Sequence, residues 1–375
     1  MRLLTVTHFF EQHGGGVERV AGHLNRCFTA QGHETSWAAS ADDRLPDAGT
    51  ASPVAMPCIN AIERLSGLPM PIPGPRALHR LATAIRTSDA VIVHDALYLS
   101  SIAAMLLARW HGKPITLIQH IAAIPFSNSL LRWVMALANR LVTHPMLRAA
   151  DQVIFISDTT RAAFSGVKFR VPPRLLFNGV ESSLFRPVQR KHDSTLLFVG
   201  RFVEKKGLSI IREMAAARPE RQVVLAGNGP IDPDAWDLPN VRVLRDRSGA
   251  SLAALYQAAD ALILPSVGEG FPLVIQEAMA CGLPVICGEE ASRADPGASA
   301  WLYPIDIDLS DPSGSAERLI TAVDAVGMTP GERAAMSAYA IATYDWGKMA
   351  EQIVAQFGSP STRQPSRRAA SSSAA

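Results

Sequence analysis

Residues 261–287 read ALILPSVGEGFPLVIQEAMACGLPVIC, and this stretch decides the fold. The run ALILP indicates a buried strand that Pro265 ends, and SVGEGF indicates a loop. Pro272 suits a first helical turn and Gly282 suits a helix end, so a helix is expected between them. The run LPVIC indicates a second buried strand. A strand, a helix and a further strand in this order predict a parallel sheet covered by helices.

The same alternation fills most of the 375 residues, a length that accommodates two domains. Strand-like and helical runs follow one another as LLTVT and GVERVAGHLNRCF, AVIVH and LYLSSIAAMLLARW, PITLIQ and SNSLLRWVMALANRL, QVIFIS and DTTRAAF, then STLLFVG and GLSIIREMAAA. A polar segment over 182–194 separates two such series. We therefore predict an α/β protein with two Rossmann-like, doubly wound domains, residues 1–187 and 188–345, that face each other across a cleft.

The end of the chain and its composition add further expectations. A helix over 346–357 is expected to pack back toward the first domain, and the Ser-, Ala-, Pro- and Arg-rich residues 358–375 are expected to be disordered. With 19% charged residues and a net charge of +2, nothing indicates nucleic-acid binding. The four cysteines lack zinc-type spacing, which favours reduced thiols in a cytoplasmic protein over disulfides. Neither a signal peptide nor a membrane-spanning run is evident.

Three glycines, Gly14, Gly15 and Gly16, stand between the first strand and an amphipathic helix. Main-chain amides at such a helix start can approach an anion, and the helix dipole favours negative charge there. A tight turn without a ligand is the alternative. The segment is neither GxGxxG nor a Walker loop, which argues against a dehydrogenase or an ATPase.

Two cations and two acids form the second group of candidates. Arg201 and Lys206 follow a strand that ends at Gly200, where a diphosphate would suit both; solvated surface cations are the alternative. Glu277 lies in an otherwise apolar helix eight positions after Glu269, and a buried carboxylate is costly unless something binds it. The alternative is that Glu277 lies on a narrow exposed edge beside Gln276.

Together these residues resemble the retaining glycosyltransferases of family 4, which have the GT-B fold. The resemblance rests on these segments in order: HGGGVERV, VIVHDA, ITLIQH, DQVIFISDTTRAAF, FNGVESSLFRP, FVGRFVEKKGL, VVLAGNGP and GEGFPLVIQEAMACGLPVI. It implies an acceptor-binding first domain and a second domain that binds a nucleotide sugar. The family's pair of glutamates, separated by seven residues, falls on Glu269 and Glu277.

The resemblance also assigns roles. Glu277 would hold the ribose hydroxyls of the donor and Glu269 the hydroxyls of its sugar, while Arg201 and Lys206 would neutralise the departing diphosphate. His120 matches a histidine that approaches the transferred sugar; a packing role is the alternative. The implied catalytic residues are His120, Arg201, Lys206 and Glu269. The implied donor-binding residues are Gly15, Gly16, Arg201, Lys206, Gly270, Phe271, Pro272, Leu273 and Glu277.

For the reaction, the resemblance implies retention without a cofactor or a metal, and a UDP- or GDP-sugar as co-substrate. The expected acceptor is a saccharide or a lipid-linked saccharide in bacterial surface polysaccharide or glycolipid synthesis. The segment CGEEASRADPGAS departs from the family pattern, which leaves sugar selectivity open. The alternatives are a non-catalytic sugar-nucleotide-binding subunit, and an epimerase or a phosphorylase of similar architecture.

Basic residues predominate in one part of the first domain. No acid occurs between Asp95 and Asp151, where Arg109, Lys113, Arg132, Arg140 and Arg148 fall. A helix predicted over 128–143 has a narrow polar strip of Arg132, Asn139, Arg140 and Thr143 on a largely apolar surface. Such a helix favours peripheral binding to an anionic membrane surface, with an ordinary core helix as the alternative.

Overall fold

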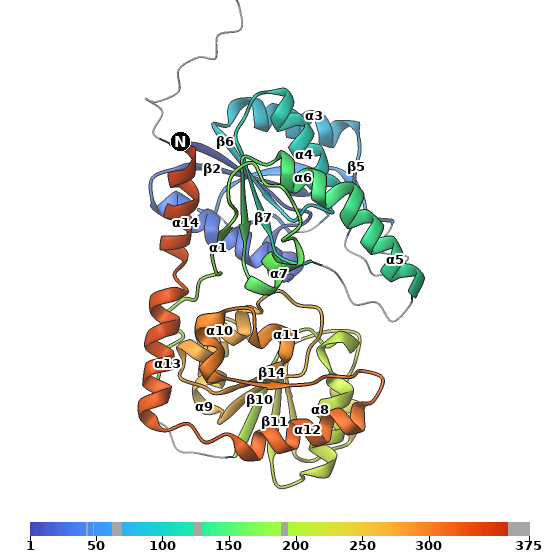
Figure 1. Cartoon of the computed structure of the whole chain (residues 1–375), viewed down its shortest axis with the longest axis vertical. Coiled ribbons are helices and arrows are strands. Elements are labelled where there is room, and N and C mark those ends of the chain that lie inside the picture. The colour runs from blue at the N-terminus through green and yellow to red at the C-terminus, as the bar shows by residue number, and fades with distance from the viewer. Residues whose placement is uncertain (43, 48, 62–69, 123–128, 189–193, 359–375) are drawn as a thin grey trace, which may run out of the picture.

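The computed structural model places the chain in two α/β domains, one above the other in Figure 1. It describes residues 1–42, 44–47, 49–61, 70–122, 129–188 and 194–358, and of 129–132 only the backbone. The predicted disorder of the tail concerns residues almost entirely outside these ranges. Among the described helices, none is long and apolar enough to cross a membrane.

The first domain contains a parallel seven-stranded sheet in the order β3-β2-β1-β6-β7-β8-β9. Its strands are β1 (Arg2–Val6), β2 (Glu34–Ser40), β3 (Ser52–Met56), β6 (Ala90–His94), β7 (Ile115–Gln119), β8 (Gln152–Phe155) and β9 (Arg174–Leu175), with a separate pair β4 (Cys58–Ile59) and β5 (Ile72–Pro73). Its helices are η1 (Glu11–His13), α1 (Gly16–Ala30), α3 (Pro75–Thr87), α4 (Leu99–Trp110), α5 (Ser129–Ala138), η2 (Asn139–Thr143), α6 (His144–Ala149) and α7 (Asp158–Ala163).

The second domain contains a parallel six-stranded sheet in the order β12-β11-β10-β13-β14-β15. Its strands are β10 (Thr195–Val199), β11 (Gln222–Ala226), β12 (Val241–Leu244), β13 (Ala261–Leu264), β14 (Val285–Gly288) and β15 (Leu302–Ile305). Its helices are η3 (Glu204–Lys206), α8 (Leu208–Ala217), η4 (Pro233–Trp236), α9 (Gly249–Ala258), α10 (Leu273–Ala280), α11 (Glu289–Ser292), η5 (Pro296–Trp301), α12 (Pro312–Ala325) and α13 (Pro330–Thr343).

The central strands are largely apolar and almost completely buried because helices cover both faces of each sheet. In β6, Ile92 points to the face covered by α1, and Val91 and Val93 point to the face covered by α3, α4 and α6. This alternation follows from the two-residue period of a strand. The fold class predicted from the strand and helix runs is therefore confirmed.

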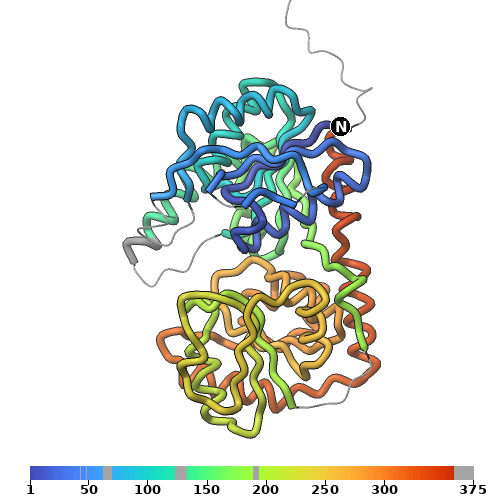
Figure 2. The backbone as a smooth tube through the Cα atoms, turned by 180° about the vertical axis from the view of Figure 1, so that it is seen from behind, coloured from blue at the N-terminus to red at the C-terminus, as the bar shows by residue number. Residues whose placement is uncertain are grey.

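The last helices, α13 and α14 (Trp346–Val354), run along one side of both domains, as Figures 1 and 2 show from opposite directions. α13 packs on α10 of the second domain, and α14 packs on α1 of the first. The chain also crosses between the domains earlier, near Val180. The Val180 N–H donates to the carbonyl oxygen of Tyr344 at 2.9 Å. The two crossings therefore lie side by side.

The strand order reverses between β1 and β6 in one sheet and between β10 and β13 in the other. Ligands of doubly wound sheets bind at the carboxyl ends of strands at such reversals. At this end of the sheets, the segments after β7 and β8 contact the segments after β13 and β14. A Cβ on Gly270 would overlap the carbonyl oxygen of His120, and Asp158 N–H donates to the carbonyl oxygen of Ala294 at 2.7 Å.

The predicted helix over 128–143 differs from the structure at its end. α5 stops at Ala138 and a π-helical turn, η2, follows. Asn139 donates to the carbonyl oxygen of Ala122 at 2.7 Å, and its side-chain oxygen accepts from the Thr143 hydroxyl at 2.9 Å. These side-chain bonds accompany the wider turn, a local feature that a hydrophobic pattern does not register.

Candidate active site

The structure brings Lys206 and Glu269 together at the carboxyl ends of β10 and β13. Lys206 Nζ lies 2.5 Å from Glu269 Oε1, with the two side chains 14% and 13% exposed. The turn that carries Lys206 packs on the strand that precedes Glu269, since Gly207 has φ +71° and a Cβ there would overlap the carbonyl oxygen of Pro265. Arg201, two residues after β10, is exposed. This end of the second domain can thus present two cations and a carboxylate to a ligand.

Glu277 lies on α10, where the Tyr256 hydroxyl donates to its Oε2 at 2.7 Å. Burial raises the pKa of Glu277, while the hydrogen bond from Tyr256 and the positive charge of Arg19 act in the opposite direction. Gln276 is fully buried, so the two residues do not share an exposed edge. One carboxylate oxygen is therefore fixed by Tyr256.

The start of α10 offers main-chain donors rather than side chains. The Phe271 ring packs edge-on against Phe177 and Tyr344, with centroids 5.8 and 5.6 Å apart. Pro272, the N-cap of α10, has no N–H, so the donors near the helix start belong to its neighbours in the chain, among them Leu273. Such donors suit an anion.

His120 lies at the end of β7 and is paired with a second histidine. Its Nε2 is 3.0 Å from His94 Nδ1, and its main-chain N–H donates to Asp95 Oδ1 at 2.7 Å. Asp95 has φ +54°, a strained conformation for a residue other than glycine. Burial lowers the pKa of His120 to about 3 and raises the pKa of Asp95 to about 7. At neutral pH one uncharged ring therefore donates a hydrogen bond to the other.

The sequence did not reveal a further buried pair beside the glycines. His8 Nε2 lies 2.8 Å from Glu18 Oε1, and the His8 ring stacks on Tyr98 with centroids 3.7 Å apart. Burial raises the pKa of Glu18, but His8 and hydrogen bonds lower it more, to below its ordinary value. A Cβ on Gly15 would lie against the end of the Glu18 side chain, so a larger residue there would require the carboxylate to shift, whereas Gly16 faces open space. A glutamate at the third helical position was the available signal.

Glu290 was also missed as a site residue. It lies in the segment that departs from the family pattern, and its carboxylate accepts a hydrogen bond from the main-chain N–H of Gly268. Burial and the negative charge of Glu269 raise the pKa of Glu290. A further acid therefore stands beside the Lys206–Glu269 pair. In the described ranges, no three His, Cys, Asp or Glu side chains are grouped as a metal site.

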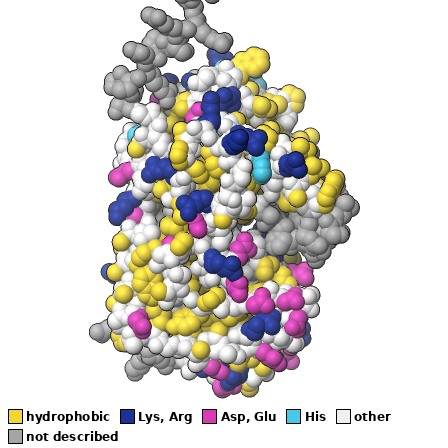
Figure 3. Space-filling model, viewed as in Figure 1, with side chains coloured by type: hydrophobic (Ala, Val, Ile, Leu, Met, Phe, Trp, Pro, Cys, Tyr) yellow, Lys and Arg dark blue, Asp and Glu magenta, His cyan; other side chains and the backbone are white. Residues whose placement is uncertain are grey.

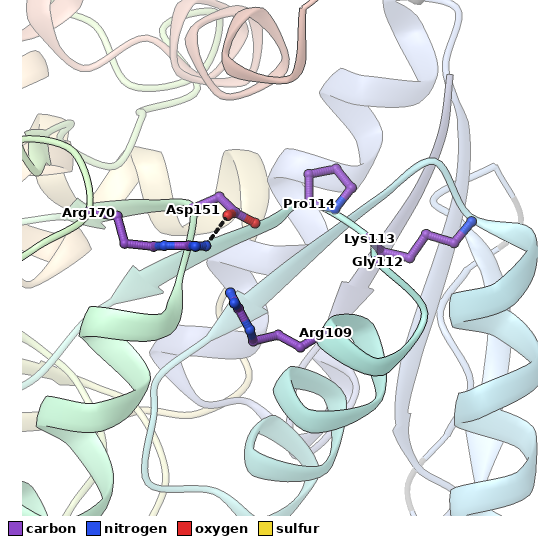
Figure 4. A pocket seen from close by; sticks show the side chains of 6 residues that line it. All are labelled: Arg109, Gly112, Lys113, Pro114, Asp151 and Arg170. Atoms are coloured by element: carbon purple, nitrogen blue, oxygen red, sulfur yellow. Dashed lines mark hydrogen bonds and ion pairs between the residues drawn. The ribbon is translucent and has the colours of Figure 1, made fainter. Parts of the chain in front are cut away.

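A separate hollow of about 360 Å³ lies at the amino ends of β7 and β8 (Figure 4). Its lining residues are Arg109, Gly112, Lys113, Pro114, Asp151 and Arg170. Because ligands of such sheets bind at the carboxyl ends, the hollow is not part of the candidate active site.

Comparison with known proteins agrees with this geometry. A family profile described as Glycosyltransferase Family 4 matches residues 14–184, and one described as Glycosyl transferases group 1 matches 193–325. The chain is 30% identical over 321 residues, 72% of each chain, to a protein named D-inositol 3-phosphate glycosyltransferase 1 from Catenulispora acidiphila.

Two solved structures share the fold at 16% identity. Sucrose-phosphate synthase from Thermosynechococcus elongatus has a TM-score of 0.69, and the superposition covers 95% of this chain and 98% of the synthase chain. Anabaena HepE in complex with UDP also has a TM-score of 0.69, and the superposition covers 95% of this chain and 99% of the HepE chain. The chain described here thus belongs to the glycosyltransferases of family 4, enzymes with the GT-B fold.

Proposed function

We propose that this glycosyltransferase moves a hexosyl group, with retention, from a UDP- or GDP-sugar to a saccharide or a lipid-linked acceptor. The observation that carries the proposal is the 2.5 Å pair of Lys206 and Glu269, with Arg201 nearby and Glu277 on the next helix. The similar Anabaena HepE was solved with UDP, which supports a nucleoside diphosphate here.

In the proposed donor complex, Glu277 accepts hydrogen bonds from the ribose hydroxyls, with Tyr256 fixing its other oxygen. Glu269 binds hydroxyls of the sugar. Lys206 moves from Glu269 toward the diphosphate, which Arg201 also contacts, and the main chain around Gly270 and at the starts of α1 and α10 supplies N–H donors. Cations and dipoles placed where charge develops lower the barrier to departure.

The proposed transfer occurs on one face of the sugar. The bond between the anomeric carbon and the diphosphate oxygen breaks, and the acceptor oxygen bonds to the same face of that carbon. The departing phosphate oxygen takes the proton of the acceptor hydroxyl. His120, uncharged and held by His94, contacts the transferred sugar from the first domain. We expect no cofactor and no metal requirement, so chelation with EDTA should leave turnover unchanged.

The acceptor and the pathway are the least constrained parts of the proposal. Surface polysaccharide or glycolipid synthesis is a prediction from the family resemblance. The name of the Catenulispora relative adds a phosphorylated cyclitol as a candidate acceptor. A panel of acceptors should therefore contain inositol phosphate as well as saccharides and lipid-linked saccharides.

A nucleotide-release assay with UDP- and GDP-sugars, with and without acceptors, tests the proposed function. A glycosyltransferase releases the nucleotide and forms a glycoside. A non-catalytic subunit would bind the nucleotide without release, an epimerase would change the sugar without any acceptor, and a phosphorylase would need inorganic phosphate. Any of these last three results would contradict the proposal.

Lys206→Ala tests the leaving-group role. Removing a charge that acts mainly on the developing diphosphate should lower kcat about 100-fold while the melting temperature changes by only a few degrees. Lys168→Ala, at an exposed lysine of the first domain, is the control. Full turnover of the Lys206 variant with a verified donor would exclude the role.

We also propose that the first domain attaches to an anionic membrane surface. On α4, Leu106 and Trp110 lie one turn apart, and 68% and 86% of their surfaces are exposed to solvent. On α5, 62% of the surface of Trp133 is exposed. Arg109 and Lys113 donate hydrogen bonds to main-chain carbonyl oxygens, at 2.7 and 2.6 Å. Because these acceptors carry no negative charge, the bonds do not neutralise the two cations. Exposed tryptophans beside cations are typical of membrane-surface binding. The side chain of Arg132 lies outside the described residues.

Flotation with vesicles tests the attachment. At low salt the enzyme should float with vesicles that contain an anionic lipid and remain behind with neutral ones. Trp110→Ser should weaken flotation, whereas Ile59→Ser, a change at an exposed position on β4, should not. Equal behaviour with both vesicle types would remove this part of the proposal.

A further inference from the structure

Arg19 lies in the first turn of α1, immediately after the glycine loop. Its main-chain N–H donates to the carbonyl oxygen of Gly15, and its side chain is exposed. The acids near this end of the helix have other cations: Glu18 pairs with His8 at 2.8 Å, and Glu11 pairs with Arg26 at 2.7 Å. In the part of the chain that the structure describes, Arg19 forms no ion pair. Its positive charge is therefore available to a ligand.

The start of α10 in the second domain packs against an apolar cluster of the first domain to which α1 contributes. Leu273, the first residue of α10, packs against the apolar cluster of the first domain that contains Val20 and Leu24. Glu277 follows Leu273 by four positions, so both lie on the same face of α10. The charge of Arg19 acts on Glu277 and also on Tyr256, lowering the pKa of each against the larger effect of burial. The charge of an arginine in the first domain thus lies close enough to the Glu277 carboxylate of the second domain to act on it.

This position lies between the two ends of the proposed nucleotide site. Glu277 is the expected partner of the ribose, and the glycine loop before α1 is an expected partner of the phosphates. A guanidinium that starts one turn after that loop, and whose charge acts on Glu277, can reach the phosphate next to the ribose. The planar guanidinium of arginine donates two parallel hydrogen bonds to phosphate oxygens. An ionised carboxylate such as Glu277 has no donor and cannot bind phosphate in this way.

We infer that Arg19 is a donor-binding residue contributed by the first domain, and that it contacts the ribose-proximal phosphate of the nucleoside diphosphate bound to the second domain. The inference rests on the proposed function, because it requires that ligand. It adds a consequence: tight donor binding requires the two domains to be together, since neither domain alone holds both Arg19 and Glu277.

Calorimetric titration of the full chain with UDP, or with GDP if that binds more tightly, and with the matching nucleoside tests the inference. Arg19→Gln should weaken binding of the diphosphate about tenfold to a hundredfold, the effect of losing a charge-assisted hydrogen bond. It should leave binding of the nucleoside within about twofold, because a nucleoside has no phosphate. Arg86→Gln, at an exposed arginine on α3 with the same loss of charge, should bind both ligands as the wild type does.

Two results would overturn the inference while the proposed function stands. The Arg19 variant could bind the diphosphate as tightly as the wild type. Its affinity for the diphosphate and for the nucleoside could instead fall by the same factor. This would show that Arg19 acts only through Glu277, by orienting it or by keeping it ionised. Wild-type protein that bound neither UDP nor GDP would contradict the proposed function and the inference together. Melting curves of both variants confirm that exposed positions were changed without unfolding.

Discussion

Burial controls the charge of the polar side chains at the ends of β6 and β7. It lowers the pKa of His120 to about 3 and that of His94 well below its usual value, and it raises the pKa of Asp95 to about 7. The two histidines are therefore uncharged at neutral pH, whereas Asp95 is partly ionised there and becomes uncharged at lower pH. An uncharged His120 can give or accept a hydrogen bond but cannot act as a fixed cation.

The histidine pair should make stability fall on acidification. Between about pH 6.5 and pH 4 the unfolded chain binds protons that the folded histidines refuse, so acid favours unfolding; Asp95, which keeps its proton when folded, acts in the opposite sense. His94→Asn should reduce the dependence of unfolding free energy on pH by about 1.4 kcal/mol per pH unit, the effect of one proton. Urea titrations at pH 4.5 to 6 measure it.

His79→Asn, at an exposed histidine on α3, is the matched control and should leave the pH dependence of the wild type. If His94→Asn also kept that dependence, His94 would already be protonated in the folded protein. The proposed neutral pair with His120 would then be wrong.

Local sequence predicted the candidate residues of the second domain more completely than those of the first. Lys206 and Glu269 come from short segments after neighbouring strands, so their meeting follows once a parallel sheet is predicted. His8 pairs with Glu18 across a loop and stacks on Tyr98, which is far away in the chain. No local pattern encodes that three-way contact, and none encodes the effect of the Arg19 charge on Glu277.

At the scale of elements, most of the buried strands were predicted, but the interior strand β2 and several edge strands were not. β1, β6, β7, β8, β10, β11, β13 and β14 correspond to apolar runs. The strands β3 and β15 lie at the edges of their sheets and contain Pro53 and Pro304. Proline is tolerated at an edge because one side of the strand has no partner, so its presence there misleads a pattern-based reading.

The loop before α10 depends on a glycine for its contact with the end of β7. Gly270→Ala places a methyl group against the carbonyl oxygen of His120, a backbone atom that cannot rotate away. The two domains should then be held apart by a fraction of an ångström to an ångström, which lowers kcat up to about 100-fold. Each domain should keep its fold, because the contact is between domains. Steady-state kinetics and thermal melting measure the two effects.

Gly166→Ala serves as the control, since a Cβ there meets nothing within 4 Å. Wild-type kcat for Gly270→Ala would show that the two loops separate during turnover. A large fall in melting temperature would instead assign the glycine to the fold of its own domain.

At the scale of the whole molecule, the two domains carry opposite charge. Residues 1–187 contain 18 Lys and Arg against 12 Asp and Glu, and residues 188–357 contain 15 against 22. On the face in Figure 3, blue side chains gather over the upper domain and magenta ones over the lower. The attraction favours approach of the domains, and salt screens it beyond about 8 Å. The positive domain is also the one proposed to face an anionic membrane.

The helix that returns to the first domain contributes to that domain's core. Ile353 on α14 is fully buried in the cluster that also contains Leu24 and Ile92. Ile353→Ala should therefore cost about 2–5 kcal/mol of unfolding free energy, the usual effect of deleting buried methyl groups. Hydrogen exchange should quicken in β1, β6 and α1 before it does in the second sheet.

Val354→Ala, at the half-buried neighbouring position, should have a smaller effect and controls for helix propensity. Faster exchange confined to the second sheet would show that α14 stabilises a different part of the molecule from the one its contacts indicate.

Because α14 lies near the end of the chain, it is synthesised after the rest of the domain that it covers. The amino-terminal half emerges first, yet the part of its sheet that α1 leaves uncovered stays exposed until Trp346, Met349 and Ile353 have left the exit tunnel. The later-made half contains all its strands before that moment and can finish first. Nascent chains of this enzyme therefore expose an unfinished apolar surface through most of translation, and that surface is where a chaperone would have to bind.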